Sequence, residues 1–208
     1  MPEGPRDWND RYATGHTPWD SGTPSNEMQS VVTEHPITPR RTLEIGCGTG
    51  TNAVWLAQQG FDMTAVDLVP LAIERAVARA KAAGVKVDFR AVNLLDPAAA
   101  ESLAAGGPYP FVFDRGVYHC LRGENLAGFL NMIKRLTGPG TLYLLLAGNT
   151  NDPQPPDQGP PRVKPEEMLA ELGPLFELVQ LREFKFDGVR IDGVDLSPLG
   201  WSALWRRK

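Results

Sequence analysis

The feature that most constrains the fold is an alternation of short apolar runs with helical patterns between about residue 42 and residue 137. Four such strand-then-helix units follow one another, and their apolar runs lack the regular polar positions of a sheet with one face in water. In the second unit, a helix that begins at Pro70 carries apolar residues at i, i+3, i+4 and i+7 from Ile73 to Ala80. The alternation predicts a parallel sheet with helices on both faces.

The first four strands are expected at residues 42–45, 61–67, 85–92 and 111–113. A fifth strand, at 141–147, is expected to be central and buried. A helix at 165–172 and two further strands near 176–186 and 201–206 complete the chain, and the last two are joined without a helical pattern. A hairpin is therefore expected, and it makes the last strand antiparallel. The segment 148–163 holds five prolines and predicts a loop that leaves the carboxyl end of a parallel strand, where α/β proteins bind ligands.

Length and charge narrow the class of protein. A chain of 208 residues fits one domain, which we expect at 41–208, preceded by an N-terminal arm at 1–40. The net charge of −4 disfavours a nucleic-acid partner, and the longest apolar stretch, 142–147, is too short to span a membrane. The first ten residues lack the apolar core of a signal peptide. We therefore expect a soluble, cytoplasmic protein that is a monomer or a weak homodimer.

Three glycines in the segment LEIGCGTG stand between the first strand and its helix. Gly46, Gly48 and Gly50 allow a ligand to approach the backbone closely and direct free helix-start amides at an anion. Their spacing departs from the dinucleotide fingerprint, because Thr51 stands where that fingerprint has its third glycine, and this counts against NAD. Asp67 ends the second strand, where an acidic side chain can accept both ribose hydroxyls of a nucleoside. If the turn serves packing alone, Asp67 is a solvated strand end.

The strand ends taken together resemble a known family. Glu44 with the three glycines, Asp67, the pair Asn93-Leu94 and then Asp114 follow four successive strands, as in the class I S-adenosylmethionine-dependent methyltransferases. The resemblance covers about residues 40–150 and implies a Rossmann-like three-layer sandwich with a seven-stranded, mostly parallel sheet in the order 3-2-1-4-5-7-6. It also implies that the glycines pack against the methionine part of the cofactor, Asp67 holds the ribose, Asn93 and Leu94 border the adenine, and residues 114–117 lie below the sulfonium.

The arm before the first core strand is dense in Trp, Tyr, Pro and Gly and shows no helical or strand periodicity until about residue 25. Its pattern W-x-x-R-Y-x-x-G-x-T-P-W-D-x-G-x-P, residues 8–24, resembles the arm of the thiopurine, thiol/halide and tellurite-resistance methyltransferases. By this resemblance Trp19 forms a wall of the methionine pocket, while Trp8 and Tyr12 lie on the substrate side. The alternative is that the three are ordinary core aromatics. The full cofactor-binding set that the resemblances imply is Trp19, Glu44, Gly46, Cys47, Gly48, Gly50, Asp67, Leu68, Asn93, Leu94, Asp114, Arg115 and Val117.

Methyl transfer from a sulfonium is an in-line displacement that requires positioning and a reactive nucleophile, and a dedicated base is optional. A thiol is partly ionised at neutral pH, so a site with few candidates for a general base favours a soft sulfur nucleophile. The candidate catalytic residues after the fourth strand are Asp114, Tyr118 and His119, of which Tyr118 and His119 also face the substrate. His119 suits proton transfer, or alternatively packs at the start of the next helix. Arg115 is expected in a structural role or on the outer substrate face.

The sequence therefore predicts an S-adenosylmethionine-dependent methyltransferase acting on a small molecule, most simply a thiol or another soft nucleophile. An O- or N-methyltransferase with His119 as base is the alternative. A nicotinamide-dependent reductase and a catalytically silent cofactor-binding module are further possibilities. The chain reads DRGVY where enzymes that methylate DNA bases carry a D/N-P-P-Y/F motif. We expect no metal, because only Asp114 and Asp152 are available where magnesium-dependent methylation needs clustered carboxylates, and Cys47 and Cys120 form no zinc motif.

Overall fold

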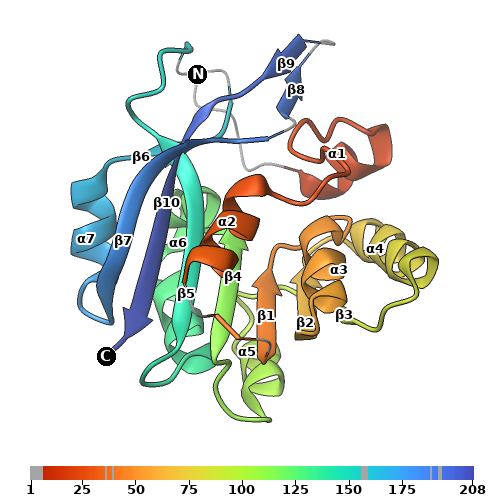
Figure 1. Ribbon diagram of the computed structural model, residues 1–208, viewed down its shortest axis with the longest axis horizontal. Coiled ribbons are helices and arrows are strands. Elements are labelled where there is room, and N and C mark those ends of the chain that lie inside the picture. Colours follow the sequence, from red (N-terminus) through yellow and green to blue (C-terminus); the bar gives the residue numbers. More distant parts are fainter. Residues whose placement is uncertain (1–6, 36, 39, 156–158, 188, 192–193) are drawn as a thin grey trace.

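The computed structural model describes residues 7–35, 37–38, 40–155, 159–187, 189–191 and 194–208. Its centre is a sheet whose strands follow the order β3-β2-β1-β4-β5-β10-β7 (Figure 1). The first five of these are parallel, and β10 is antiparallel to both of its neighbours. This confirms the predicted order and the antiparallel last strand. The strands are β1 (Arg41–Ile45), β2 (Asp62–Asp67), β3 (Asp88–Ala91), β4 (Phe111–Arg115), β5 (Leu142–Asn149), β7 (Phe176–Lys185) and β10 (Leu199–Arg207).

Helices cover both faces of the sheet, as the alternating pattern predicts. Phe111 and Phe113 of β4 pack in one layer and Val112 in the other, because successive side chains of a strand point to opposite faces. The helices of the Phe111 face are α2 (Asn26–Glu34), α3 (Thr51–Gln58) and α4 (Pro70–Ala83), and those of the Val112 face are α5 (Pro97–Ala104), α6 (Val117–Leu136) and α7 (Pro165–Leu172). Within the described residues, no helix is both long and apolar enough to cross a membrane.

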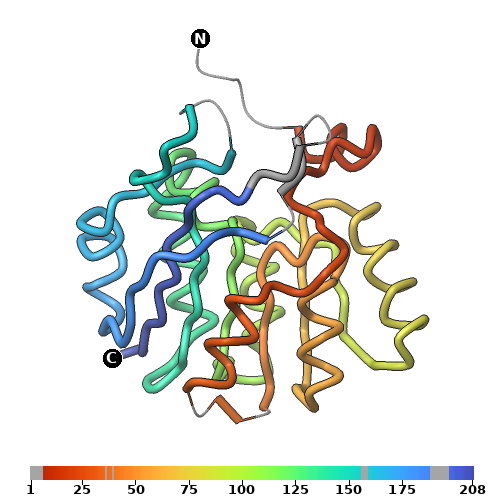
Figure 2. Tube along the Cα trace, turned by 45° about the horizontal axis from the view of Figure 1, so that its top comes forward, coloured from red at the N-terminus to blue at the C-terminus, as the bar shows by residue number. Residues whose placement is uncertain are grey.

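The carboxyl ends of the parallel strands meet at one edge of the sheet, and two segments from distant parts of the sequence lie at this edge. They are the helix α1 (Trp8–Thr14) of the arm and the hairpin of β8 (Val189–Ile191) and β9 (Val194–Leu196), as Figure 1 shows. Figure 2 shows α1 at the same edge from a second direction. The hairpin of β8 and β9 lies in the connection between β7 and β10 and was not predicted, whereas the predicted hairpin is the antiparallel pair of β7 and β10. The arm and this connection, which are far apart in the sequence, are thus brought together above the strand ends.

The helix α1 corrects the expectation of an irregular arm before residue 25. The side chain of Asp7 accepts a hydrogen bond from the Asp10 amide at 3.1 Å and caps the helix, and Gly15, with φ of 77°, ends it. Only seven residues lie between these two signals, which is too short a stretch for a helical period to be recognised in the sequence. The capping residue and the glycine were the available signals.

The proline-rich segment 148–163 is fastened at both ends. Its last residues form β6 (Arg162–Val163), which pairs with the end of β5 and adds an eighth strand to the predicted seven. Within the segment, the carboxylate of Asp152 accepts a hydrogen bond from the Leu199 amide at 2.6 Å, at the start of β10. The predicted loop is therefore held against the same sheet edge as the arm and the hairpin.

Candidate active site

The glycine turn after β1 is closely approached from two sides. Gly46, Gly48 and Gly50 have φ of 64°, 55° and 76°, a region that side-chain-bearing residues rarely adopt. A Cβ atom on Gly46 would lie 2.2 Å from Val117 Cγ2, and one on Gly48 would lie 2.9 Å from the Tyr12 hydroxyl. The turn thus has no room for a side chain at these positions, and both the arm and the start of α6 reach it.

Asp67 joins the end of β2 to the glycine turn. Its Oδ2 accepts a hydrogen bond from the Gly48 amide at 2.9 Å, and its Oδ1 accepts one from the Val69 amide at 3.0 Å. Burial raises the pKa of this carboxyl above its usual value, and the amides of Val69, Gly48 and Leu68 oppose that shift. A carboxylate has about four lone-pair sites, so acceptor capacity remains for a hydroxyl donor of a ligand. The next side chain, Leu68, is 49% exposed at the same strand end.

Glu44 on β1 carries the clearest sign of a ligand-binding site, which is a buried carboxylate oxygen. Its side chain is buried, its Oε1 accepts a hydrogen bond from Asn52 Nδ2 at 3.2 Å, and its Oε2 is buried without a hydrogen-bond partner among the described residues. Burial raises the pKa of Glu44 to about 8, although the charge of Arg115 opposes the shift. A buried acceptor without a donor costs about 1–3 kcal/mol. The α-ammonium group of a methionine-type cofactor would supply both the donor and the opposite charge.

The aromatic residues of the arm form one cluster at the start of α4. The ring of Trp19 lies edge-on to Trp8 at 5.5 Å and to Tyr12 at 6.1 Å, and its Nε1 donates to the Tyr12 hydroxyl at 3.3 Å. Tyr12 is buried against Val69, and burial raises the pKa of its hydroxyl. The cluster therefore packs on the core at Val69, and through Tyr12 it also reaches the glycine turn at Gly48.

Polar contacts hold the arm over the same turn. Asp20 Oδ2 accepts a hydrogen bond from the Thr49 hydroxyl at 2.8 Å, and Arg79 on α4 donates to the Thr49 carbonyl at 2.9 Å and to the Gly22 carbonyl at 3.5 Å. The sequence analysis missed these residues. For Asp20 a signal was present, because it belongs to the arm motif, whereas nothing in the sequence marks Arg79 among the exposed positions of its helix.

Arg115 at the end of β4 connects the arm with the segment that precedes β8. Its Nη1 donates to the Trp19 carbonyl and its Nη2 to the Asp187 carbonyl, both at 3.1 Å. The guanidinium lies 5.2 Å from the ring centre of Phe186, and burial lowers its pKa from the ordinary value. Arg115 thus ties together two segments that are 168 residues apart in the chain (187 − 19). Asp187 was not among the predicted residues.

Asp114, the residue before Arg115, is completely buried and caps the start of α6. Its Oδ1 accepts a hydrogen bond from the Val117 amide at 2.8 Å, and its Oδ2 accepts from the Tyr118 amide at 3.1 Å and the Tyr143 hydroxyl at 2.9 Å. Burial raises the pKa of Asp114 to about 7, against the effect of these donors. Both oxygens therefore have protein partners.

The two other candidates for catalysis also have protein partners. The hydroxyl of Tyr118 donates to Glu171 on α7 at 2.6 Å, so this side chain is directed into the layer between α6 and α7. His119 is 8% exposed, and its Nδ1 accepts a hydrogen bond from the Gly148 amide at the end of β5 at 3.0 Å. A Cβ atom on Gly116 would lie 3.2 Å from His119 Nε2, which places the ring beside the end of β4.

The end of β3 holds the two residues predicted at the adenine. Asn93 is exposed and its Oδ1 accepts a hydrogen bond from the Leu95 amide at 3.0 Å, while Leu94 is buried. Cys47 in the glycine turn is buried, and burial raises the pKa of its thiol. Within the described part of the chain, no group of three or more His, Cys, Asp or Glu side chains is arranged to hold a metal ion.

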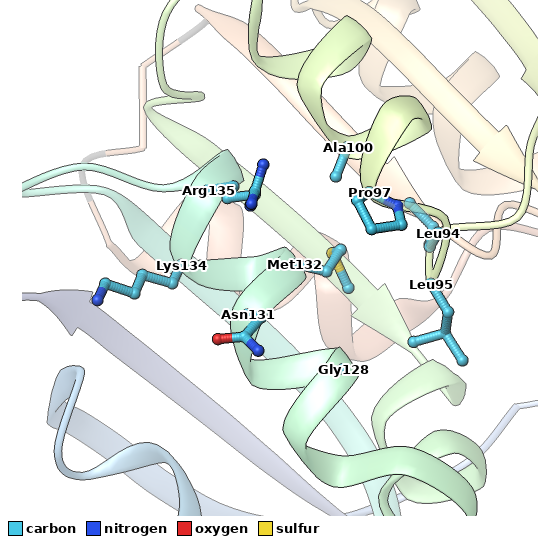
Figure 3. Close-up of a pocket in the computed structure, with 9 residues that line it drawn as sticks. All are labelled: Leu94, Leu95, Pro97, Ala100, Gly128, Asn131, Met132, Lys134 and Arg135. Atoms are coloured by element: carbon cyan, nitrogen blue, oxygen red, sulfur yellow. The ribbon is translucent and has the colours of Figure 1, made fainter.

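A groove of about 520 Å³ lies elsewhere, between α5 and α6. Figure 3 shows Pro97 and Ala100 of α5 on one side and Met132 of α6 on the other. The groove shares only Leu94 with the predicted cofactor-binding set. It is therefore a feature of the helical layer, distinct from the edge where the glycine turn, Asp67 and the arm meet.

The strand order, with helices on both faces of the sheet, defines a Rossmann-like fold of the kind found in S-adenosylmethionine-dependent methyltransferases. Magnesium protoporphyrin IX methyltransferase from Synechocystis PCC 6803, solved with bound SAM, superposes with a TM-score of 0.66 at 14% identity over 99% of this chain and 86% of that chain. The model of the thiopurine S-methyltransferase (TPMT) family matches residues 4–194, and the chain belongs to this family. S-Adenosylmethionine is the methyl donor of the class.

Two further similarities carry information on relatives. The chain is 25% identical over 152 residues to the 2-heptyl-1-hydroxyquinolin-4(1H)-one methyltransferase of Mycobacteroides abscessus, covering 73% of this chain and 64% of that enzyme. A structure described as "Conversion of a Disulfide Bond into a Thioacetal Group during Echinomycin Biosynthesis" superposes with a TM-score of 0.78 at 22% identity, over 96% of this chain and 90% of that chain. The chain spans between 22% and 64% of the length of the first curated relatives that it matches.

Proposed function

We propose that the protein transfers the methyl group of S-adenosylmethionine to the sulfur atom of a small thiol. When bound, the cofactor supplies a methyl group on a sulfonium, and the demethylated cofactor leaves as a neutral thioether. The protein binds the cofactor, orients the acceptor and covers the site. In this proposal Glu44 Oε2 receives the α-ammonium group, the glycine turn lies along the methionine part, and Asp67 accepts the ribose hydroxyls. Leu68, Asn93 and Leu94 border the adenine.

The observation that carries the choice of sulfur is the hydrogen bond from the Gly148 amide to His119 Nδ1. A neutral imidazole that accepts at Nδ1 carries its proton on Nε2, so it has no lone pair left to take a proton from an acceptor. Asp114 and Tyr118 are likewise engaged by protein partners. A methyl acceptor that needs no side-chain base fits this arrangement best, and a thiol is a few per cent ionised near neutral pH.

We further propose that the arm, residues 1–40, covers the active site of a methyltransferase domain formed by 41–208. The support comes from the described residues of the arm, because Tyr12 lies against Gly48 and Asp20 bonds Thr49 in the same turn. Exclusion of water from a displacement site strengthens the positioning of the reactants. Trp8 and Trp19 then line the space between cofactor and acceptor. The cytoplasmic location and the state as a monomer or weak homodimer stay predictions from the sequence.

An oxygen acceptor is the second candidate. The relative from Mycobacteroides abscessus is named for a hydroxyquinolone, and His119 lies at the strand ends where a base would be required. For His119 to act as a base, its ring would have to release the Gly148 amide, which then loses its hydrogen-bond partner in a buried position. This cost of about 1–3 kcal/mol is the reason for ranking oxygen second.

The test measures methyl transfer from labelled S-adenosylmethionine to a panel of thiols, phenols, hydroxyquinolones and amines, with wild-type protein and the His119→Ala variant. We expect thiols to be methylated by both proteins, with a loss of less than about threefold in the variant, because no lone pair of His119 is available to the acceptor. His35→Ala is the matched control, since His35 contacts Gln180 away from the strand ends. A variant that binds S-adenosylhomocysteine normally but methylates nothing would establish His119 as the base and favour oxygen or nitrogen.

A further inference from the structure

Asn52, the second residue of α3, contacts the buried carboxylate and the arm with opposite ends of one side chain. Its Nδ2 donates to Glu44 Oε1 at 3.2 Å, and its Oδ1 accepts a hydrogen bond from the Ser25 amide at 2.9 Å. An amide group is planar, so rotation that improves one of these contacts also moves the other. The side chain therefore links Glu44 to the end of the arm.

The contact at Ser25 leads on to the second covering segment. Ser25 caps α2 by accepting a hydrogen bond from the Met28 amide at 3.3 Å, and the next residue, Asn26, donates its backbone amide and its Nδ2 to Asp187 at 2.8 and 2.9 Å. The Asp187 carbonyl in turn accepts from Arg115, which also holds the Trp19 carbonyl. A path thus runs from Glu44 to the arm and to the segment before β8, through hydrogen bonds and through the backbone between Ser25 and Asn26.

We infer that Asn52 is a positioning residue that couples occupation of the cofactor site at Glu44 to closure of the arm and of the segment around Asp187. The inference rests on the proposed function, because it takes the ligand of Glu44 Oε2 to be the ammonium group of the cofactor. It assigns to Asn52 no contact with the cofactor or the acceptor. Its consequence is an order of events, in which the cofactor binds first and the walls of the acceptor site become fixed afterwards.

The physical reason lies in the charge of Glu44. Burial raises the pKa of this carboxyl to about 8 despite the opposing charge of Arg115, so without a bound ligand the neutral form predominates at pH 7. A bound cation favours the ionised form, and a hydrogen bond to an ionised acceptor is roughly twice as strong as one between neutral groups. The Asn52 amide is then held more firmly, and the Ser25 amide that bonds it is held with it. Coupling of this kind is reciprocal, so a closed arm also tightens cofactor binding.

The anchor of the arm at Thr49 is separate from Glu44. Thr49 donates to Asp20 and accepts from Arg79, and neither partner contacts Glu44 or Asn52 in the described structure. Replacement of Thr49 by valine keeps the shape of the side chain and removes both contacts. Thr49→Val is therefore a matched control that loosens the arm without interrupting the path through Asn52.

The experiment measures hydrogen exchange of amides in residues 7–25, with and without saturating S-adenosylhomocysteine, alongside calorimetric binding of the same ligand. In the wild type we expect the ligand to slow exchange by about tenfold. In Asn52→Ala the slowing of exchange by the ligand should fall below about twofold, and the affinity for the ligand should fall with it, as reciprocity requires. In Thr49→Val the amides should exchange faster both with and without the ligand, but the ligand should still slow exchange by about tenfold.

Asn52→Leu is the second variant, because it keeps the approximate size of the side chain but has neither the donor for Glu44 nor the acceptor for Ser25. We expect an arm that is less protected without ligand and gains less than about twofold in protection when the ligand is added. A wild type that binds the ligand without gaining protection, or Asn52 variants that gain as much as the wild type, would overturn the inference. Failure of the wild type to bind S-adenosylhomocysteine at all would instead refute the proposed function.

Discussion

The two halves of the candidate site differ in how many of their polar groups are already satisfied. At the ends of β1 and β2, Glu44 keeps one buried oxygen without a partner in the described part of the chain, and Asp67 keeps acceptor capacity. At the ends of β4 and β5, Asp114 and His119 are bonded to backbone amides of the protein. The chain thus leaves acceptors open where a charged, hydroxyl-rich cofactor is proposed to bind. At the ends of β4 and β5, where the nucleophile needs only to be positioned, the polar groups already have partners within the protein.

The halves also differ in how they are assembled. The first is built from residues 44–69, one strand-turn-helix unit and the next strand end, so its groups are fixed by local geometry. The second brings together the arm, the end of β4, the end of β5 and Asp187, which meet through Arg115. Perturbations of the first half should therefore act on cofactor affinity, and perturbations of the second on turnover.

The largest effect is expected from Gly48→Val. A side chain at this position meets the Tyr12 hydroxyl and blocks the backbone face of the turn, so S-adenosylhomocysteine should bind more than about a hundredfold more weakly. Gly140→Val is the control, because Gly140 has a similar positive φ of 83° with nothing within 4 Å of an added Cβ. Calorimetry on both variants separates obstruction from backbone strain. If Gly48→Val and Gly140→Val bound S-adenosylhomocysteine with equal affinity, the glycine turn would not be part of the cofactor site.

Asp67→Ala should weaken binding of S-adenosylhomocysteine by at least about tenfold. Hydrogen bonds between a carboxylate and two hydroxyls contribute about 1.5–3 kcal/mol each, and 1.4 kcal/mol corresponds to a factor of ten. Asp62→Ala, at the exposed opposite end of the same strand, is the control and should bind normally. If the folded Asp67→Ala protein kept its affinity, the ribose assignment would be wrong.

Affinity for S-adenosylhomocysteine should rise by about tenfold between pH 6.5 and 7.5 and level off above pH 8, since Glu44 must lose a proton to bind the ammonium. Arg115 and Asp67 are the charged groups that oppose and reinforce the raised pKa of Glu44. The ligand-free protein should lose stability over the range from pH 4.5 to 8, because the unfolded state releases the proton of Glu44 first. Glu44→Gln should abolish the rise in affinity, and a rise that persists in this variant would point to another group.

The smallest effect is expected from Arg115→Lys, which tests the second half. A lysine keeps the charge but cannot donate to the Trp19 and Asp187 carbonyls in the same way as a guanidinium, so turnover should fall by about fivefold. Cofactor affinity should change by less than about twofold, because the charge beside Glu44 remains. Arg90→Lys, in an exposed ion pair with Asp88, is the control for steady-state kinetics. A fall in affinity that equals the fall in turnover would show that the two halves are not separable.

The sequence by itself determined the sheet and the first half of the site. The apolar runs, the glycines after β1 and Asp67 after β2 lie within one contiguous stretch, and strand ends of parallel units meet at one edge by geometry. Strand order followed from the resemblance, because short helical connections by themselves allow several arrangements. The open oxygen of Glu44 could not be predicted, since burial without a partner depends on everything packed around it.

Only the tertiary structure decided which groups of the second half are free. Asp114, Tyr118 and His119 are neighbours in the sequence and were predicted together, but the helix that begins at Val117 directs them to different partners. Arg115 and Asn52 gained their roles from carbonyls and amides of the arm and the hairpin segment. Backbone groups have no residue-specific signal in the sequence, so contacts with them appear only when distant segments have been brought together.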